Sequence, residues 1–307
     1  ATHYRKSNEV LAMRNSYHGR SFTTQAITSH RSWSNTAVSG LSVNFVQGPY
    51  KLRSPHHDAD DEGYTQACVA DLVQVIDMMT AGDVACLIAE PIQGVGGFAT
   101  PPDGFFGAMH KVLDSHGILF VSDEVQTGWG RTGDHFWGYQ AHGIVPDMLT
   151  FAKGVGNGIT LAGIVGRPEV MDCLPHLSFS TFGGNPLSTA AGLATLRYVK
   201  EADLQGNAKA RGQQMKERLS PVVEGADWIA ELRGKGLMQA IETVHAGSIE
   251  PDAKAAKVLL ERAKDNGLLI GKGGLYGNVL RLTPMLNITE QEMDQGLDAL
   301  IAAIASV

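Results

Sequence analysis

Short apolar runs alternate with helical patterns of apolar residues over the first two-thirds of the chain. Residues 84–89 predict a buried strand, and residues 105–116 predict a helix whose apolar positions share one face and which Gly117 ends. Three further strands are predicted at 118–121, 147–151 and 161–165. This alternation predicts an α/β fold with a doubly wound, largely parallel sheet and helices on both faces.

The pattern changes after about residue 200. A long helix is predicted over 186–204, amphipathic charged helices over 207–219 and 252–266, and short strands over 268–270 and 279–282. Thr289 and Glu292 form a capping-box pattern that opens a last helix running towards Ala305. The sequence therefore predicts a large domain over residues 1–200 and a smaller α/β domain over residues 201–307.

Composition and charge exclude several classes of function. The 307 residues are 43% hydrophobic, so a sizeable core is possible, and 25 basic against 32 acidic residues give a net charge of −7. A mildly acidic chain without a basic run argues against nucleic-acid and anionic-membrane partners. No apolar run has the length of a membrane span. Residues 56–62 contain acidic residues and histidines but no spaced ligands, so they predict a solvated loop rather than a metal site.

Cysteine usage bears on the compartment. Cys68, Cys86 and Cys173 are odd in number and far apart in the sequence. This argues against a disulfide framework or a zinc site and is typical of a reducing environment. We expect a cytoplasmic protein, with the mitochondrial matrix as the alternative.

Lys153 is the first candidate for chemistry. It follows an apolar strand and opens the run Lys-Gly-Val-Gly-Asn-Gly. An ammonium group is costly to bury without a partner, and a lysine held at a strand end can lose its proton and form a Schiff base with a carbonyl compound. A surface lysine in a glycine-rich turn is an equally good interpretation of this segment taken alone.

Asp123 is the second candidate, thirty positions earlier at the end of another apolar strand. A carboxylate that faces a pyridine nitrogen stabilises the protonated ring, which is the electron sink that a pyridoxal enzyme needs beside its Schiff-base lysine. An isolated aspartate at a strand end is more often a helix cap or a metal ligand. Its pairing with Lys153 on a neighbouring strand end favours pyridoxal chemistry.

Together these segments resemble the class III (omega) aminotransferases. Asp-Glu-Val-Gln-Thr-Gly at 123–128, followed by Gly-Arg-Thr-Gly at 130–133, resembles the signature of that family. The approach to Lys153, with Pro-Asp and Thr-Phe-Ala-Lys-Gly, is also similar. Further matches, in the family's order, lie at 17–20, 90–94 and 180–186. The set covers nearly the whole chain, and the segments 93–95 and 233–238 are most similar to the alanine–glyoxylate type.

The resemblance implies a fold type I transaminase with pyridoxal 5′-phosphate as cofactor. Lys153 would carry the cofactor and move the proton between the substrate Cα and the cofactor's C4′ atom, and Asp123 would pair with the ring nitrogen. Four residues would lie around the ring: Gln126 at the phenolic oxygen, Val125 and Tyr17 on the two ring faces, and His18 in the loop beside the ring. Thr181 would contact the phosphate bound by the neighbouring subunit of a homodimer. Arg281 would bind the substrate carboxylate.

Most of these positions also have a structural interpretation. Tyr17 and Val125 fit an ordinary core, Thr181 fits a cap of the following helix, and Arg281 fits a surface strand. Glu90 ends a strand before proline and is expected to organise hydrogen bonds around the site rather than to react.

Two departures from the family's pattern matter. Relatives that use glutamate often carry an acid at the position of Val95, so its absence predicts that Arg281 is open to short substrates such as alanine, pyruvate or glyoxylate. The family's phosphate loop, which opens a helix before the Tyr17–His18 segment, is not in this sequence. We therefore expect the sequence to be a fragment that describes the phosphate site and substrate pocket only in part.

The predicted reaction is amino transfer in two half-reactions, from an amino acid or omega-amino donor to a short keto acid, with ping-pong kinetics. The alternatives are another pyridoxal reaction on the same scaffold, such as decarboxylation or an amino shift, and a non-catalytic chain that keeps the fold as a binding subunit. A nicotinamide oxidoreductase is disfavoured because the sequence has no dinucleotide fingerprint.

Overall fold

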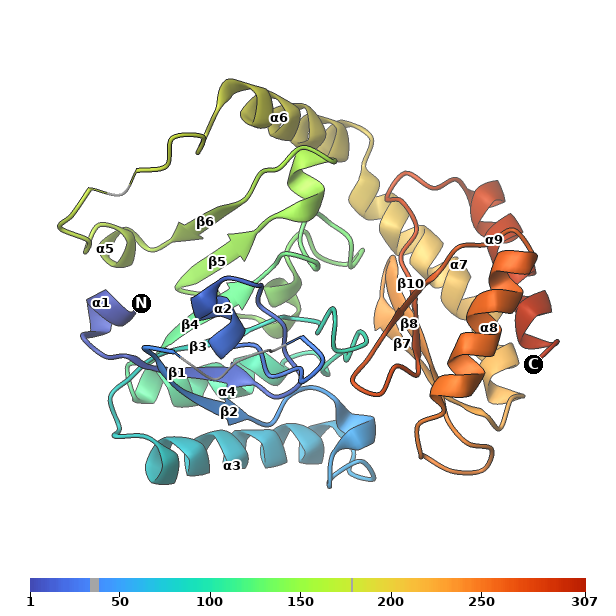
Figure 1. Ribbon diagram of the computed structural model, residues 1–307, viewed down its shortest axis with the longest axis horizontal. Helices are drawn as coiled ribbons and strands as arrows, with labels where there is room; N and C mark the ends of the chain where they lie inside the picture. Colours follow the sequence, from blue (N-terminus) through green and yellow to red (C-terminus); the bar gives the residue numbers. More distant parts are fainter. Residues whose placement is uncertain (34–38, 178) are drawn as a thin grey trace. The chain divides into compact units, whose positions relative to one another are not determined.

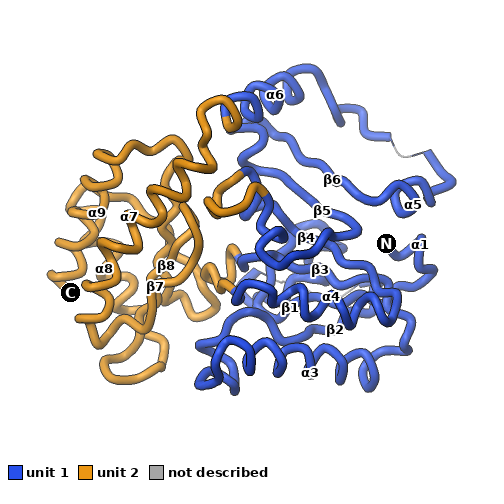
Figure 2. The backbone as a smooth tube through the Cα atoms, turned by 180° about the vertical axis from the view of Figure 1, so that it is seen from behind, with its two compact units in different colours: residues 1–93, 101–129, 137–198 blue, residues 94–100, 130–136, 199–307 orange. Residues whose placement is uncertain are grey.

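The computed structural model describes residues 1–33, 39–177 and 179–307. The chain forms two compact units, coloured separately in Figure 2. The first contains residues 1–93, 101–129 and 137–198, and the second contains residues 94–100, 130–136 and 199–307. Two short segments thus leave the first unit and return to it, which no pattern in the sequence indicates.

The first unit is built on a six-stranded sheet in the order β2-β1-β3-β4-β5-β6 (Figure 1). Every neighbouring pair is parallel except β5–β6, which is antiparallel. The predicted α/β fold with a largely parallel sheet is therefore confirmed. The strands are β1 (Glu9–Met13), β2 (Ser42–Val46), β3 (Val84–Ala89), β4 (Leu119–Asp123), β5 (Met148–Phe151) and β6 (Gly163–Gly166).

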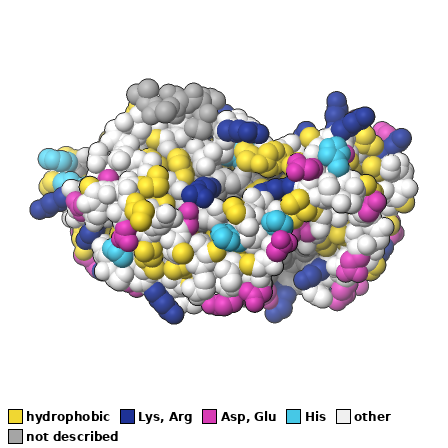
Figure 3. Space-filling model, turned by 90° about the horizontal axis from the view of Figure 1, so that it is seen from below, with side chains coloured by type: hydrophobic (Ala, Val, Ile, Leu, Met, Phe, Trp, Pro, Cys, Tyr) yellow, Lys and Arg dark blue, Asp and Glu magenta, His cyan; other side chains and the backbone are white. Residues whose placement is uncertain are grey.

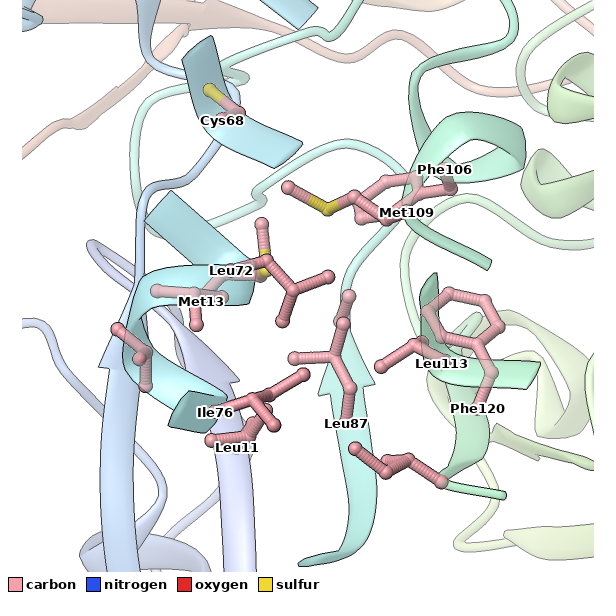
Figure 4. Close-up of a cluster of buried hydrophobic side chains, with 14 of the residues drawn as sticks. Leu11, Met13, Cys68, Leu72, Ile76, Leu87, Phe106, Met109, Leu113 and Phe120 are labelled. Carbon is pink, nitrogen blue, oxygen red and sulfur yellow. The ribbon is translucent and has the colours of Figure 1, made fainter. Parts of the chain in front are cut away.

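Alternating side chains bury both faces of this sheet. Leu11 and Phe120 belong to a core under α3 (Asp61–Met79) and α4 (Phe105–Ser115), as the sticks in Figure 4 show. The neighbouring positions of the same strands, such as Val121, belong to a separate cluster on the opposite face. Because successive side chains of a strand point to opposite faces, strands buried on both faces read as continuous apolar runs.

Local signals set the ends of the helices around the sheet. The Asp60 side chain accepts a hydrogen bond from the Gly63 N–H at the start of α3, and Gly117 follows α4 with a φ of +63°. The other helical elements are α1 (Thr2–Arg5), α2 (Phe22–Ala26), α5 (Pro168–Met171), α6 (Pro186–Glu201) and the 3₁₀ turns η1 (Lys51–Arg53), η2 (Gly138–His142) and η3 (Lys153–Gly156).

The second unit pairs an antiparallel sheet with three helices. Its strands run in the order β7-β8-β10-β9, and its core joins them to α7, α8 and α9. Thr289 and Glu292 form the predicted capping box at the start of α9. The elements are β7 (Ile229–Lys235), β8 (Met238–Thr243), β9 (Gly271–Gly273), β10 (Val279–Leu282), α7 (Leu204–Glu224), α8 (Ala253–Asp265) and α9 (Glu290–Ile304).

The predicted strand over 268–270 is wrong. These residues form an irregular segment, in which Leu268 and Ile270 pack against the core of the second unit and Leu269 between them is exposed. The strand is formed by the next three residues, Gly271–Gly273, which pair with β10. The ends of two other strands lie one or two residues beyond their predicted positions, those of β4 towards Asp123 and those of β6 towards Gly166.

The three cysteines differ in burial. Burial raises the pKa of both the Cys68 and the Cys86 thiol to about 11, whereas Cys173 is only half-buried; all three are free thiols.

Acidic and basic side chains are interspersed on the face drawn in Figure 3. Among the described residues, no helix combines the length and apolar character that crossing a membrane requires.

Replacing Leu87 with alanine should lower the free energy of unfolding by about 2–5 kcal/mol, because this fully buried β3 side chain would leave a cavity among helix and strand residues. Urea denaturation measures the change. Met78→Ala is the control: its side chain is exposed on α3, and its effect should stay within about 0.5 kcal/mol. Equal losses in the two variants would contradict this assignment of the core.

Candidate active site

The site begins where β4 and β5 end. Asp123, the last residue of β4, lies in register with Thr150 of β5, and the Glu124 N–H donates to the Thr150 carbonyl at 2.9 Å. Lys153 follows three residues later and opens the η3 turn. Because the strands are parallel, their carboxyl ends meet at the same sheet edge, where ligands bind in open α/β folds. The two candidates for pyridoxal chemistry therefore come from paired strand ends.

Asp123 is held by hydrogen bonds on both carboxylate oxygens. The Val125 N–H donates to Oδ1 at 3.2 Å, and Oδ2 lies 2.8 Å from Nδ1 of His18. The side chains of Asp123 and His18 are 8% and 1% exposed, so this pair is buried. Nε2 of His18 is also buried and has no hydrogen-bond partner. The structure thus joins two site residues that lie 105 positions apart in the sequence.

The electrostatic environment of His18 favours its charged form. Burial, the largest single influence, would lower the pKa of His18, but its hydrogen bond to Asp123 and the charges of Asp123 and Glu90 outweigh burial and raise that pKa above its ordinary value. The hydrogen bond to Asp123 and the negative charges of Asp123 and Glu90 are thus the interactions that favour the imidazolium form of His18.

Lys153 lies on the exposed η3 turn and not at a buried strand end. Its φ is +50°, a left-handed conformation that costs a non-glycine residue about 1–3 kcal/mol and is concentrated at functional sites. Trp129 also has a positive φ, and its ring packs edge-on against Phe151 at 5.4 Å, two residues before Lys153. The turn is therefore strained and supported by aromatic packing.

Glu124 fixes the turn that follows Asp123. This fully buried carboxylate accepts hydrogen bonds from the Ser122 and Thr127 hydroxyls and from the backbone N–H groups of Gly138 and Tyr139. Burial raises the pKa of Glu124, and these four hydrogen bonds oppose that shift. No motif in the sequence assigns Glu124 a role of its own, although its spacing of three from Thr127 is a local signal for such a turn.

The predicted ring contacts are half-buried. Val125 and Gln126 lie on the turn that Glu124 anchors, and Tyr17 lies beside His18. The Tyr17 N–H donates to Oε1 of Glu90 at 2.9 Å, and the Tyr17 ring packs edge-on against Trp33 at 5.4 Å. Glu90 therefore organises backbone near the site.

Thr181 lies on an exposed segment before α6. The cap of α6 is Asn185, whose Oδ1 accepts a hydrogen bond from the Ser188 N–H at 3.0 Å, so Thr181 is not needed as a cap. Its contact with a phosphate of a neighbouring subunit stays a prediction.

Arg281 belongs to the second unit, at the third position of β10. Its side chain is half-buried, and burial lowers the pKa of the guanidinium. Within the described part of the chain, no carboxylate lies within 4.0 Å of it, and its buried Nε has no hydrogen-bond partner. A half-buried cation without a counter-ion can accept an anionic ligand.

Comparison with known proteins decides the family. Residues 1–304 match the profile of the aminotransferase class-III family. The chain belongs to the class III aminotransferases. It is 39% identical over 299 residues to an alanine–glyoxylate aminotransferase 2 homologue, described as mitochondrial, from Arabidopsis thaliana; the match covers 97% of this chain and 61% of that protein.

Other class III aminotransferase relatives differ in reaction. The chain is 36% identical over 312 residues to a leucine/methionine racemase from Thermococcus litoralis. The match covers 99% of this chain and 69% of that protein. Among solved structures, a pyridoxal-phosphate-bound amine transaminase from an uncultivated Pseudomonas species superposes with a TM-score of 0.92 at 31% identity, over 99% of this chain and 72% of that one. The chain thus spans about three-fifths to three-quarters of these proteins.

The residues present fit pyridoxal 5′-phosphate, the cofactor that the class III assignment indicates. Asp123 could supply a buried carboxylate for a ring nitrogen, Lys153 could supply an amine just beyond the neighbouring strand, and the orphaned Nε2 of His18 is a polar atom that a ligand or a water can satisfy. In the described ranges, no three His, Cys, Asp or Glu side chains gather in a way that could hold a metal ion.

The His18–Asp123 pair should make stability depend on pH. Because the folded pKa of His18 is raised, the charged pair stabilises the fold fully below the ordinary histidine pKa of about 6.5, and this contribution is lost as pH rises through the raised value. The difference in free energy of unfolding between wild type and His18→Gln should therefore shrink from pH 6 towards pH 9.

Urea denaturation across this pH range measures the difference. His110→Gln is the matched control, since His110 pairs with Asp114 on the surface of α4, where ion pairs contribute little. A wild-type advantage over His18→Gln that is the same at every pH would show that the pair does not titrate as argued.

Proposed function

We propose that this class III protein is a pyridoxal-phosphate-dependent transaminase that moves an amino group from an amino acid or omega-amino donor to a short keto acid, pyruvate or glyoxylate. The observation that carries the proposal is the pairing of β4 and β5, which brings Asp123 and Lys153 to one sheet edge. The bound cofactor supplies an electron sink for the substrate's Cα–H bond.

The chain's own groups divide the remaining work. Nζ of Lys153 would anchor the cofactor and, once released, would take the proton from the substrate Cα and return it. Asp123, which His18 holds in place at 2.8 Å, would pair with the ring nitrogen. Gln126 donates to the phenolic oxygen, and Val125 and Tyr17 confine the ring from its two faces.

Arg281 is proposed to bind the substrate carboxylate through its guanidinium fork. Its half-buried position without a counter-ion among the described residues supports this role. Val95 cannot neutralise it as an acid would. This combination favours short substrates such as alanine, pyruvate and glyoxylate.

Racemisation is the principal competing reaction, because one relative is a leucine/methionine racemase. Both reactions begin with removal of the Cα proton, but only transamination consumes a keto acid. Incubation with L-alanine and glyoxylate separates them: pyruvate and glycine are the products of amino transfer, whereas D-alanine without pyruvate is the product of racemisation. Release of carbon dioxide would indicate a decarboxylase.

A homodimer is the proposed assembly. The described residues of the segment 159–198 expose many large apolar side chains, among them Leu177, Phe179, Phe182 and Leu187, which are 71–102% exposed. Contiguous exposed apolar residues mark association surfaces. Thr181 lies within this segment. A residue that contacts the partner's phosphate has to lie at the dimer interface, so its position agrees with the proposed role. The proposed compartment is the cytoplasm, with the mitochondrial matrix as the alternative.

Mixing the intact protein with pyridoxal phosphate should give a visible absorbance band that borohydride abolishes and that Lys153→Ala lacks. Transaminase turnover should fall by at least about 10³-fold in that variant, because both the anchor and the proton carrier are lost. Lys111→Ala, a change to an exposed lysine on α4, is the control and should keep both properties.

Peptide mapping after reduction adds a second readout, because the cofactor's mass should be fixed on the peptide that contains Lys153. A band that is indifferent to Lys153, or no band at all, would leave the chain as a binding subunit with the family's fold.

Phe182→Glu together with Leu187→Glu should convert the dimer to monomers, because two buried charges at an apolar interface are costly. Light scattering measures the mass of the intact protein. Met78→Glu, an equally polar change on exposed α3, should leave the dimer intact. A wild-type mass of one chain would refute the proposed assembly.

A further inference from the structure

The side chain of Arg281 lies across two glycines of β9. A Cβ on Gly273 would stand 3.1 Å from both Cδ and Nε of Arg281, and one on Gly271 would stand 3.6 Å from Nη2. The missing side chains of β9 therefore leave room for the arginine. Its place in the sheet is fixed from the other side by β8, where Ala240 is its partner in register.

An aromatic ring is the partner that the structure gives to this guanidinium. The Arg281 Cζ atom lies 5.7 Å from the centre of the Phe98 ring, within the range of a cation–π interaction. Phe98 is 1% exposed and has a φ of +55°, so a buried ring is held on strained backbone. Strained backbone persists only where the surroundings hold it in place.

Arg233 provides that restraint. Its Nε and Nη2 both donate to the carbonyl oxygen of Gly97, at 2.9 and 2.6 Å, and so clamp the peptide that joins Gly97 to Phe98. Its Nη1 donates to Oε2 of Glu242 at 2.5 Å. Glu242 is fully buried and accepts a second hydrogen bond from Nδ2 of Asn278 at 3.1 Å.

A ring and a carboxylate would hold Arg281 in different ways. A carboxylate accepts hydrogen bonds from the guanidinium N–H groups and occupies the donors that a substrate needs. A phenyl ring attracts the cation through its face and accepts no N–H bond of comparable strength, so the donors stay available. The second unit thus restrains its arginine without neutralising it.

We propose that Phe98 is a specificity-determining residue that positions the Arg281 guanidinium for short carboxylate substrates, and that Arg233, backed by Glu242, is the positioning residue that holds Phe98. This inference rests on the proposed function in one respect, the binding of a substrate carboxylate by Arg281. It gives a role to Arg233, the first residue of the Arg-Gly-Lys-Gly-Leu-Met segment at 233–238; the proposed reaction itself assigns this segment none.

The test measures carboxylate binding and turnover separately in the intact, cofactor-loaded protein. Propionate, which has the carboxylate but no amino group, is titrated by calorimetry, and KM and kcat are measured for L-alanine with glyoxylate. Phe98→Leu should raise the Kd of propionate and the KM of alanine by about 5- to 30-fold and leave kcat nearly unchanged, as expected for loss of a partly buried cation–π contact.

Two further variants separate this role from general damage. Phe98→Tyr keeps the ring and should stay close to wild type. In an Arg281→Gln background, where propionate binding is already lost, Phe98→Leu should raise the KM of alanine no further. If Phe98→Leu does not fold, Arg233→Lys takes its place, because lysine keeps the charge opposite Glu242 but cannot clamp the Gly97 carbonyl with two N–H groups.

The inference is overturned if Phe98→Leu lowers kcat with KM unchanged, or if its effect persists in the Arg281→Gln background. It is upheld if propionate binding weakens as expected even when the wild-type protein transfers no amino group; that result would refute only the proposed transamination. Absence of propionate binding in the wild type would refute the carboxylate role of Arg281, and this inference with it.

Discussion

Parallel pairing of β4 with β5 is the constraint on which the rest of the site depends. The register that sets Asp123 opposite Thr150 decides that a carboxylate and the Lys153 turn emerge at one edge of the sheet. Moving Asp123 by one position along β4 would send its side chain to the opposite face of the sheet. The helices and core clusters on both faces hold that register, so packing far from the site fixes the geometry on which the chemistry relies.

Features encoded within a few residues were accessible from the sequence. The limits of β3 follow from one apolar run, and the start of α9 follows from Thr289 and Glu292, because a cap and its partner lie within one turn. The segments around Asp123 and Lys153 combine such local order with residue types that few chemistries require together. The resemblance to the class III family rests on these short segments and on their order.

What the sequence did not disclose depends on distant contacts. The partner of Asp123 lies 105 positions away in His18, and the segment that carries Phe98 packs with strands more than 130 positions later. Such pairings leave no periodic signal along the chain. The wrong strand at 268–270 has the same origin: Leu268 and Ile270 have strand-like composition, but the core recruits them as anchors and leaves the ladder to glycines beside Arg281.

The unequal burial of the three thiols gives the protein a built-in labelling position. Cys68 and Cys86 are buried and burial raises the pKa of both thiols, so Cys173, the half-buried one of the three, is where an alkylating dye should react first. This sulfur lies just before the exposed apolar residues at 174–187. A fluorophore attached there reports on the surroundings of that segment without any engineered cysteine, and the native chain can serve as its own probe for association.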